Sequence, residues 1–569
     1  MMALFIRLFS RVMIFNLLFL VSHSTYAIYP APVTAKNGLV VSEHALASQV
    51  GVDILKKGGN AIDAAVAVGY ALAVVNPCCG NIGGGGFMLI HLANGKNIFL
   101  NFREKAPLAA KPDMYLDKNG NLIPNKSING YLAIGVPGTV LGLDEALKRY
   151  GSMKREDVMA PAILLADNGF QLSDFDLDIM NEAINDFRQQ QNVAAIFLKN
   201  NRLYDSGDIL IQKNLAHTLK LIAKAGPDAF YKGDIAKEIV AESKKNGGIL
   251  SEDDFAQYSV EEYMPITCTY RGYVVTSSPP PSSGGTTLCE ILNILEPYPL
   301  DKMGFHSAQG THFIVEAMRN AFADRNNQLG DPLFVKNPVD KLISKEYAAI
   351  IRKRIKLYRA TPSSEIRSGI AQNEKQNTTH YSVVDNKGNA VSVTYTLNGS
   401  FGARVIALQT GFFLNNEMDD FATKVGSPNQ FGLVQGVANN IEPRKTPLSS
   451  MTPTILTKNG QLFMVVGSPG GPRIITSVLQ TILNVLDYGM DIESAVDAPR
   501  FHQQWLPDVV YMEPFSFSAD TEALLIKRGY TLQSNAPWSA VEAIYIDPIT
   551  KKLYGGSDNR RPAGGAIGY

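Results

Sequence analysis

The sequence predicts an α+β protein, because helical patterns and a dense set of short strands occupy different parts of the chain. Residues from Tyr131 to Leu357 are mostly helical in pattern, as in the amphipathic run from Leu215 to Ala225. After Thr378 the pattern changes to short alternating strands separated by glycines. Two hairpins can be placed in this strand-rich part, and both carry candidate functional residues.

The chain before the helical part begins with two helical patterns, Ala45 to Lys57 and Ala61 to Val75. Asn81 to Gly86 is rich in glycine but lacks the lysine and the strand-to-helix setting of a phosphate loop, so we interpret it as a tight turn into the strand Phe87 to Leu92. Arg103 follows a later strand. An arginine there usually forms a surface ion pair, but strand ends are also where substrate-binding groups collect.

The first hairpin runs from Thr378 through a turn at Asp385 to Asn389. With this turn Val384 faces Ala390, and the same register places Thr378 opposite Thr396. Two hydroxyl groups then meet at one end of the hairpin. Since threonine pairs are common supports of sheets, this stretch alone favours a structural role.

The second hairpin turns at Asn459-Gly460, which favours a two-residue turn. Its register, with Lys458 opposite Gln461, brings Ser449 and Ser450 to the same end as a glycine-rich segment that closes with Gly470-Gly471. Pro472 then begins a helix whose apolar positions run to Leu486. Amides at a helix start stabilise negative charge, although a ligand-free turn is the alternative interpretation.

The amino terminus predicts a signal peptide, residues 1–27. Arg7 and Arg11 precede an apolar run from Val12 to Val21, and small residues end at Ala27. The run is too short for the alternative, a membrane anchor, and no later stretch is apolar enough to span a bilayer. We therefore expect an exported protein, periplasmic or secreted. Its formal net charge of zero gives no indication of a nucleic-acid partner.

Cysteine and histidine usage predicts neither a metal nor a cofactor. Export permits disulfides, but adjacent Cys78 and Cys79 are poorly placed to pair with each other. Cys268 and Cys289 are compatible with a disulfide or with buried free thiols. The eight histidines show no metal-ligand spacing.

A hydroxyl nucleophile needs a base, and no His/Asp partner has a recognisable spacing here. An amino-terminal threonine supplies its own base, because a free α-amine has a pKa of about 7.7 to 8.0. This chemistry requires cleavage of the Asn377-Thr378 bond. The preceding segment, Tyr358 to Asn377, has the polar composition of an exposed, mobile connector, which suits such a cut.

The chain resembles the γ-glutamyltranspeptidase family, also called glutathione hydrolases, along essentially its whole length after Ala27. The most specific motifs are Thr378-Thr379-His380-Tyr381-Ser382, Asn415-Asn416-Glu417-Met418-Asp419-Asp420-Phe421, Pro447-Leu448-Ser449-Ser450-Met451 and Gly467-Ser468-Pro469-Gly470-Gly471.

This resemblance implies an amino-terminal nucleophile hydrolase with a four-layer αββα sandwich. It implies self-cleavage at Asn377-Thr378 into a large subunit, 28–377, and a small subunit, 378–569. Thr378 would form a γ-glutamyl-enzyme from glutathione or another γ-glutamyl compound and pass the acyl group to water, an amino acid or a dipeptide. Thr396 would orient the new amino terminus.

The resemblance also assigns three groups of residues to substrate recognition. They are Arg103, Ser449 and Ser450 for the α-carboxylate, Asn398, Glu417 and Asp420 for the α-ammonium, and Gly470 and Gly471 for the oxyanion.

Four positions depart from the family pattern, namely Phe431, Thr446, Pro472 and Asn559. Phe431 stands where bacterial relatives often carry a lid tyrosine, so closure of the lid without that hydroxyl is an open question. The alternatives to a γ-glutamyltranspeptidase are a related cephalosporin acylase or poly-γ-glutamate hydrolase, and an unprocessed, inactive binding protein.

Overall fold

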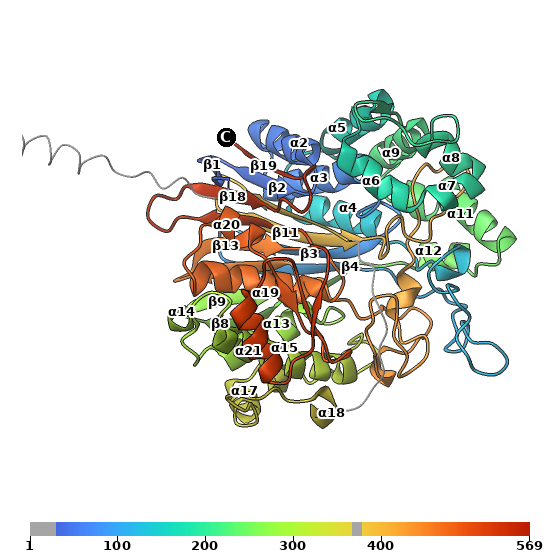
Figure 1. Ribbon diagram of the computed structural model, residues 1–569. Coiled ribbons are helices and arrows are strands. Elements are labelled where there is room, and N and C mark those ends of the chain that lie inside the picture. Colours follow the sequence, from blue (N-terminus) through green and yellow to red (C-terminus); the bar gives the residue numbers. More distant parts are fainter. Residues whose placement is uncertain (1–29, 367–377) are drawn as a thin grey trace, which may run out of the picture. The chain divides into compact units, whose positions relative to one another are not determined.

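Two seven-stranded antiparallel sheets form the centre of the structure (Figure 1). The computed structural model describes residues 30–366 and 378–569, so the predicted signal peptide and Asn377 lie outside the described residues. The first sheet has the order β1 (Val33–Ala35), β18 (Leu553–Ser557), β17 (Glu542–Ile546), β13 (Gln461–Gly467), β12 (Thr454–Lys458), β9 (Tyr273–Ser277), β8 (Ile266–Tyr270). The second has the order β19 (Gly565–Gly568), β2 (Leu39–Ser42), β10 (Thr379–Val384), β11 (Ala390–Thr396), β3 (Gly85–His91), β4 (Asn97–Phe102), β7 (Glu261–Tyr263).

The two sheets pack face to face through an apolar layer, and helices cover their outer faces. In β3, Phe87 and Leu89 belong to the layer between the sheets, whereas Met88 and Ile90 belong to the core under the helices. Successive side chains of a strand point to opposite faces, so β3 is buried on both. This arrangement is the predicted four-layer αββα sandwich.

The helices over the second sheet include α2 (Ala45–Lys56) and α3 (Ala61–Val75), close to their predicted bounds. α3 is buried at all 15 positions because it lies between the sheet and α5, which explains its uniformly apolar sequence. The other helices on this side are α4 (Thr139–Tyr150), α5 (Arg155–Asn168), α6 (Asp174–Glu182), α7 (Ile184–Gln189), α8 (Gln191–Phe197), α9 (Lys213–Ala225), α10 (Asp228–Tyr231), α11 (Asp234–Lys245) and α12 (Glu252–Ala256).

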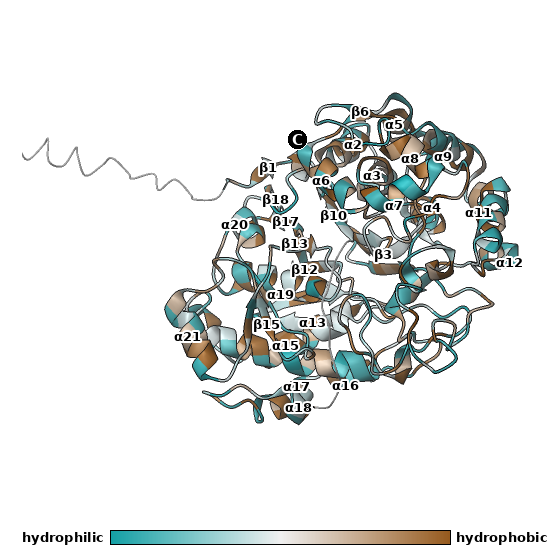
Figure 2. Cartoon of the chain, turned by 45° about the vertical axis from the view of Figure 1, so that its right-hand side comes forward, coloured by the Kyte–Doolittle hydropathy of each residue, from teal (hydrophilic) through white to brown (hydrophobic). Residues whose placement is uncertain are grey.

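The helices over the first sheet include α13 (Gly284–Leu295), α15 (Ala308–Gln328) and α19 (Arg473–Leu486). In Figure 2 peripheral helices such as α11 and α21 each carry both teal and brown residues, as amphipathic surface helices do.

The remaining elements are α14 (Leu300–Met303), α16 (Val339–Leu342), α17 (Lys345–Arg352), α18 (Ser363–Ile366), α20 (Ile492–Asp497), α21 (Ala519–Lys527), β5 (Phe170–Gln171), β6 (Ile209–Leu210), β14 (Phe501–His502), β15 (Val510–Met512) and β16 (Leu532–Ser534). No helix among the described residues is long and apolar enough to cross a membrane.

The predicted register of the first hairpin is confirmed, since Val384 pairs with Ala390 and Thr379 with Tyr395. The second hairpin turns at Asn459-Gly460, where both residues have positive φ, and Lys458 pairs with Gln461 as predicted. A bulge between Leu456 and Thr457 then shifts the pairing by one residue. The irregularity therefore lies inside the hairpin.

The cysteines form two disulfides, Cys78–Cys79 and Cys268–Cys289. The expectation that the adjacent pair would not bond was wrong. Both of its cysteines lie in the tight turn that connects α3 to β3, and there they are buried.

The described part of the predicted connector, residues 358–366, is exposed only in part: Tyr358, Arg359, Ser364 and Glu365 are exposed, whereas Ala360 and Ser363 are buried. Ser363 is 1% exposed, and its hydroxyl donates to the Trp505 carbonyl over 2.6 Å. Its amide donates to Asp508 Oδ2 over 2.7 Å, while Arg319 Nη1 donates to Asp508 Oδ1 over 2.5 Å. Ser363 thus belongs to a docked polar network, which composition alone did not predict. Residues 367–377 lie outside the described residues.

Candidate active site

The two threonines meet at the predicted end of the first hairpin. Thr378 directly precedes β10 and is 4% exposed. Thr396 Oγ1 donates to Thr378 Oγ1 over 3.3 Å and accepts the Asn398 amide over 2.8 Å. The Thr396 hydroxyl therefore accepts from the Asn398 amide while it donates toward Thr378. Asn398 has a left-handed φ of 76° and donates from its side chain to the Asn416 carbonyl.

A buried carboxylate supports the strand that begins at Thr378. β2 pairs with β10 only from Tyr381 onward and leaves the sheet after Ser42. Glu43 is the next residue, and its Oε1 accepts the His380 amide over 2.9 Å in place of a strand carbonyl. Sequence reasoning missed Glu43; a charged residue directly after a buried strand was the available signal. Arg561 Nη1 lies 3.3 Å from Glu43 Oε2, but burial dominates and raises the pKa of Glu43 to about 7.

This raised pKa makes the stability of the protein pH-dependent. The pKa lies above the ordinary value of 4.5, so the stability contribution is present below pH 4.5 and is lost as pH rises through about 7. We expect Glu43→Gln to remove this loss, which amounts to roughly 3 kcal/mol. Melting temperatures at pH 5 and pH 8 check it, with Glu346→Gln at an exposed glutamate as the control. If the difference in melting temperature between pH 5 and pH 8 is the same in Glu43→Gln as in the wild type, Glu43 is not the group responsible.

Arg103 is a buried ion-pair centre and not a surface arginine. It directly follows β4, is 1% exposed, and its Nη2 lies 2.6 Å from both Glu417 Oε1 and Asp420 Oδ2. Its Nη1 lies 3.5 Å from Glu104 Oε2. Burial raises the pKa of Glu417 and of Asp420, whereas Arg103 opposes the rise. One guanidinium therefore faces three carboxylates, an arrangement that attracts a further cation such as an ammonium group.

The paired serines lie in the loop before β12, held by the proline-rich segment 277–285. Ser449 donates its amide to the Pro281 carbonyl over 2.9 Å, and its own carbonyl accepts the Ser283 amide over 2.8 Å. Segment 277–285 is buried throughout, which confirms its interpretation as a buried or wall-lining loop. Ser449 Oγ accepts the Met451 amide, and Ser450 Oγ accepts from Arg325 Nη2 over 3.0 Å.

The two glycines stand at the start of α19 with positive φ, 124° at Gly470 and 53° at Gly471. Neither amide donates a hydrogen bond to another backbone carbonyl of the described chain. A Cβ at Gly471 would lie 3.0 Å from the ring of Phe431, which is itself 3% exposed. Phe431 thus packs against Gly471 by apolar contact.

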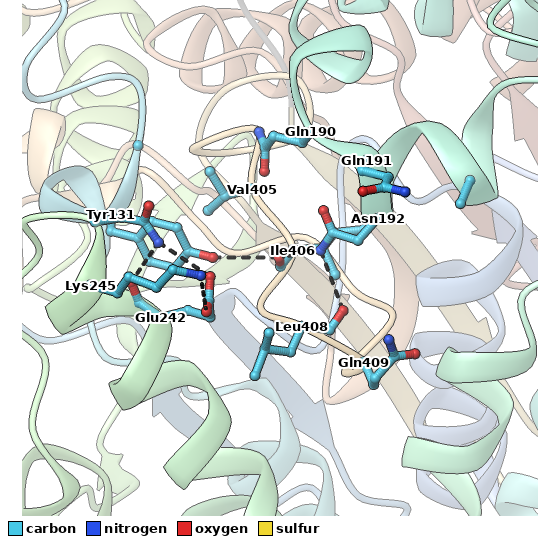
Figure 3. Close-up of a pocket in the computed structure, with 13 residues that line it drawn as sticks. Tyr131, Gln190, Gln191, Asn192, Glu242, Lys245, Val405, Ile406, Leu408 and Gln409 are labelled. Carbon is cyan, nitrogen blue, oxygen red and sulfur yellow. Dashed lines mark hydrogen bonds and ion pairs between the residues drawn. The ribbon is translucent and has the colours of Figure 1, made fainter.

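Polar contacts join the serines to the carboxylates around Arg103. Gln435 accepts from Arg325 and donates to the Asp420 carbonyl. Asn398 links the threonine end to Asn416, the neighbour of Glu417. A separate cavity of about 730 Å³ lies between α8, α11 and the loop 405–409 (Figure 3). None of the predicted site residues lines this cavity.

The αββα sandwich is the architecture of the amino-terminal nucleophile hydrolases, and the solved structures that this chain resembles belong to that class. The family model "Gamma-glutamyltranspeptidase" matches residues 47–568. The chain belongs to the γ-glutamyltranspeptidase family.

Similar proteins are found across nearly the full length. The chain is 53% identical to the glutathione hydrolase proenzyme of Pseudomonas sp. (strain A14), covering 99% of each chain. It is 50% identical to the glutathione hydrolase proenzyme of Escherichia coli K12, over 95% of this chain and 93% of the relative. The crystal structure of cephalosporin acylase from Bacillus halodurans matches with a TM-score of 0.83 at 30% identity, covering 96% of this chain and 98% of the other. That of Helicobacter pylori γ-glutamyltranspeptidase matches with a TM-score of 0.57 at 46% identity, covering 61% and 97%.

Proposed function

We propose that this protein is an autoprocessed γ-glutamyltranspeptidase and glutathione hydrolase. The hydrogen bond from Thr396 to Thr378 at the head of β10 carries the proposal, because it sets two hydroxyls where the chemistry needs a nucleophile and its orienting partner. Residues 28–377 form the large subunit and 378–569 the small subunit after removal of a signal peptide, 1–27. Export places the enzyme in the periplasm or outside the cell.

In the maturation step Thr378 Oγ1 attacks the carbonyl carbon of Asn377, and the peptide nitrogen leaves as the α-amine of Thr378. Water then hydrolyses the resulting ester and frees the amino terminus. In catalysis this amine accepts the proton of Thr378 Oγ1 while the oxygen attacks the γ-glutamyl carbonyl. The proton passes to the leaving amine, cysteinylglycine in the case of glutathione. Water or an acceptor amine then releases the γ-glutamyl group.

The charges around Arg103 support recognition of a free γ-glutamyl end. The substrate α-ammonium is attracted by Glu417 and Asp420 together with the Asn398 side chain, because the carboxylates outnumber the guanidinium. The Ser449 and Ser450 hydroxyls and Arg103 hold the α-carboxylate. Arg103 Nε and Nη1 lack hydrogen-bond partners among the described residues, which suits donors that await an anion.

Gly470 and Gly471 stabilise the oxyanion of the tetrahedral intermediate. Their amides stand at the helix start of α19, where partial positive charge collects. Loss of one such donor costs on the order of 3 kcal/mol of transition-state stabilisation.

A cephalosporin acylase activity is the second candidate, because the structure of an acylase matches most of the chain. A glutaryl group has no α-ammonium, so the carboxylates around Arg103 favour γ-glutamyl substrates.

Purified protein tests both candidates. We expect a denaturing gel to show two chains in place of one 62.0 kDa precursor, and assays to show hydrolysis of glutathione and γ-glutamyl-p-nitroanilide well above that of glutaryl-cephalosporins. Addition of glycylglycine as acceptor separates transfer from hydrolysis. A single uncleaved chain without hydrolysis of glutathione would instead identify an inactive binding protein.

A further inference from the structure

Arg325 is a buried cation that forms no salt bridge with a carboxylate of the described residues. It lies on α15 and is 1% exposed. The arginines buried to a similar degree, Arg103, Arg319 and Arg500, each form a salt bridge with a carboxylate. Among the described residues no carboxylate lies within ion-pair distance of Arg325.

All hydrogen bonds of Arg325 go to neutral side-chain oxygens. Its Nε donates to Ser283 Oγ over 3.0 Å, and its Nη2 donates to Ser450 Oγ over 3.0 Å. Its Nη1 donates to Asn326 Oδ1 over 2.9 Å and to Gln435 Oε1 over 3.3 Å. A guanidinium kept charged in a buried site without a counter-ion is costly unless an anion arrives during function.

The bond to Ser450 determines which way that hydroxyl can act. Since Ser450 Oγ accepts from Arg325, its own proton remains available for a different acceptor. Ser449 shows the same pattern, because its Oγ accepts the Met451 amide over 3.1 Å. Both hydroxyls are thus prepared to donate, which is the arrangement that a carboxylate requires.

The ion pairs of Arg103 show what a second cation would add. Arg103 is already shared among Glu104, Glu417 and Asp420, so its charge is not available to a substrate carboxylate alone. Arg325 adds a positive charge on the serine side of the same network, where Asp420 is the carboxylate that acts on it.

We propose that Arg325 is a positioning residue for the substrate α-carboxylate, which holds the Ser450 hydroxyl as a donor and supplies the positive charge behind it. The inference rests on the proposed function, in which Arg103, Ser449 and Ser450 bind that carboxylate. It makes Arg325 a determinant of specificity for γ-glutamyl amides over amides that lack an α-carboxylate.

The test compares two substrates that differ only in that group, γ-glutamyl-p-nitroanilide and 4-aminobutyryl-p-nitroanilide. We expect Arg325→Met to raise KM for the first by roughly 10- to 100-fold with little change in kcat, as a loss of uniform binding does. The second substrate should show no such change. Arg325→Lys keeps the charge but not the planar guanidinium, so its KM for γ-glutamyl-p-nitroanilide should lie between those of Arg325→Met and the wild type.

Two controls separate folding from recognition. Self-cleavage on a denaturing gel reports folding of each variant without added substrate. Arg319→Met, on the same helix and equally buried but paired with Asp508, should lower the melting temperature without changing the ratio of KM values between the substrates. If Arg325→Met fails to cleave, the comparison is made with Arg325→Lys.

Equal weakening of both substrates in the Arg325 variants would reduce Arg325 to a structural residue and overturn the inference. Arg103→Ala and Ser450→Ala, measured in parallel, report on the carboxylate site itself. If Arg103→Ala and Ser450→Ala raise KM only for the substrate with the α-carboxylate, and Arg325→Met does not, only the role of Arg325 is overturned. If none of the three variants affects the two substrates differently, the proposed carboxylate site is overturned.

Discussion

Thr378→Ala is expected to remain a single uncleaved chain with no hydrolysis of γ-glutamyl-p-nitroanilide. One oxygen atom is proposed to act twice, in maturation and in catalysis, so its removal abolishes both steps. Activity should fall by at least about 10⁴-fold, as it does when a catalytic nucleophile is removed. A denaturing gel and the anilide assay measure the two losses separately.

Thr378→Ser is the matched control for this prediction. It keeps a hydroxyl and should therefore cleave, more slowly than wild type, and retain measurable turnover. Thr379→Ala, at the neighbouring buried threonine, should still cleave because its hydroxyl faces Asn76 and not Thr396. Normal processing of Thr378→Ala would exclude Thr378 as the processing nucleophile.

Arg103→Ala has the second largest expected effect, because it removes both a substrate contact and the counter-ion of three carboxylates. KM for γ-glutamyl-p-nitroanilide should rise by about 100-fold, whereas kcat should change little. Loss of one partner of a buried ion pair destabilises a fold by about 3 to 5 kcal/mol, so the melting temperature should also fall.

The stability loss in Arg103→Ala should depend on pH. Burial raises the pKa of Glu104 from 4.5 to about 7 even with Arg103 present, and removal of the guanidinium raises it further. A carboxyl with a raised folded-state pKa contributes stability that is present below pH 4.5 and lost as pH rises through its folded value. The variant should therefore approach the wild-type melting temperature at pH 4.5 and fall below it by pH 8. Arg103→Lys, which restores a charge, should recover part of the loss, and a pH-independent deficit would contradict this account.

Local sequence was sufficient to predict strand pairing where a short turn fixes the register of a hairpin. The pairing of Thr378 with Thr396 follows from a hairpin closed by Asp385 to Asn389, because one turn fixes the register of all residues beyond it. The second hairpin shows the limit of this reasoning. Its turn was predicted correctly, but the bulge after Leu456, in a hairpin whose strands also pair with β9 and β17, left no local signal.

The motifs indicated which residues form the site, but not which partners balance their buried charges. Arg103 was assigned by resemblance, yet its contacts with Glu417 and Asp420 join residues more than 300 positions apart. Glu43 and Arg325 escaped notice because their importance lies in burial and in long-range partners. The docked segment around Ser363 was misread for the same reason, since polar composition does not distinguish a solvated loop from a buried polar network.

What the sequence by itself determined about this protein is therefore the family, the threonine hairpin and the identity of the candidate site residues. These features depend on residue type and short spacing, which a linear chain displays directly. The tertiary structure alone decided that Glu43 accepts the His380 amide where β2 leaves the sheet, and that three carboxylates share Arg103. It also decided that Arg325 donates to Ser450 without a salt bridge to any carboxylate of the described residues. Charge compensation and pKa depend on burial and on distances between remote residues, and these arise only when the two sheets and their helices pack together.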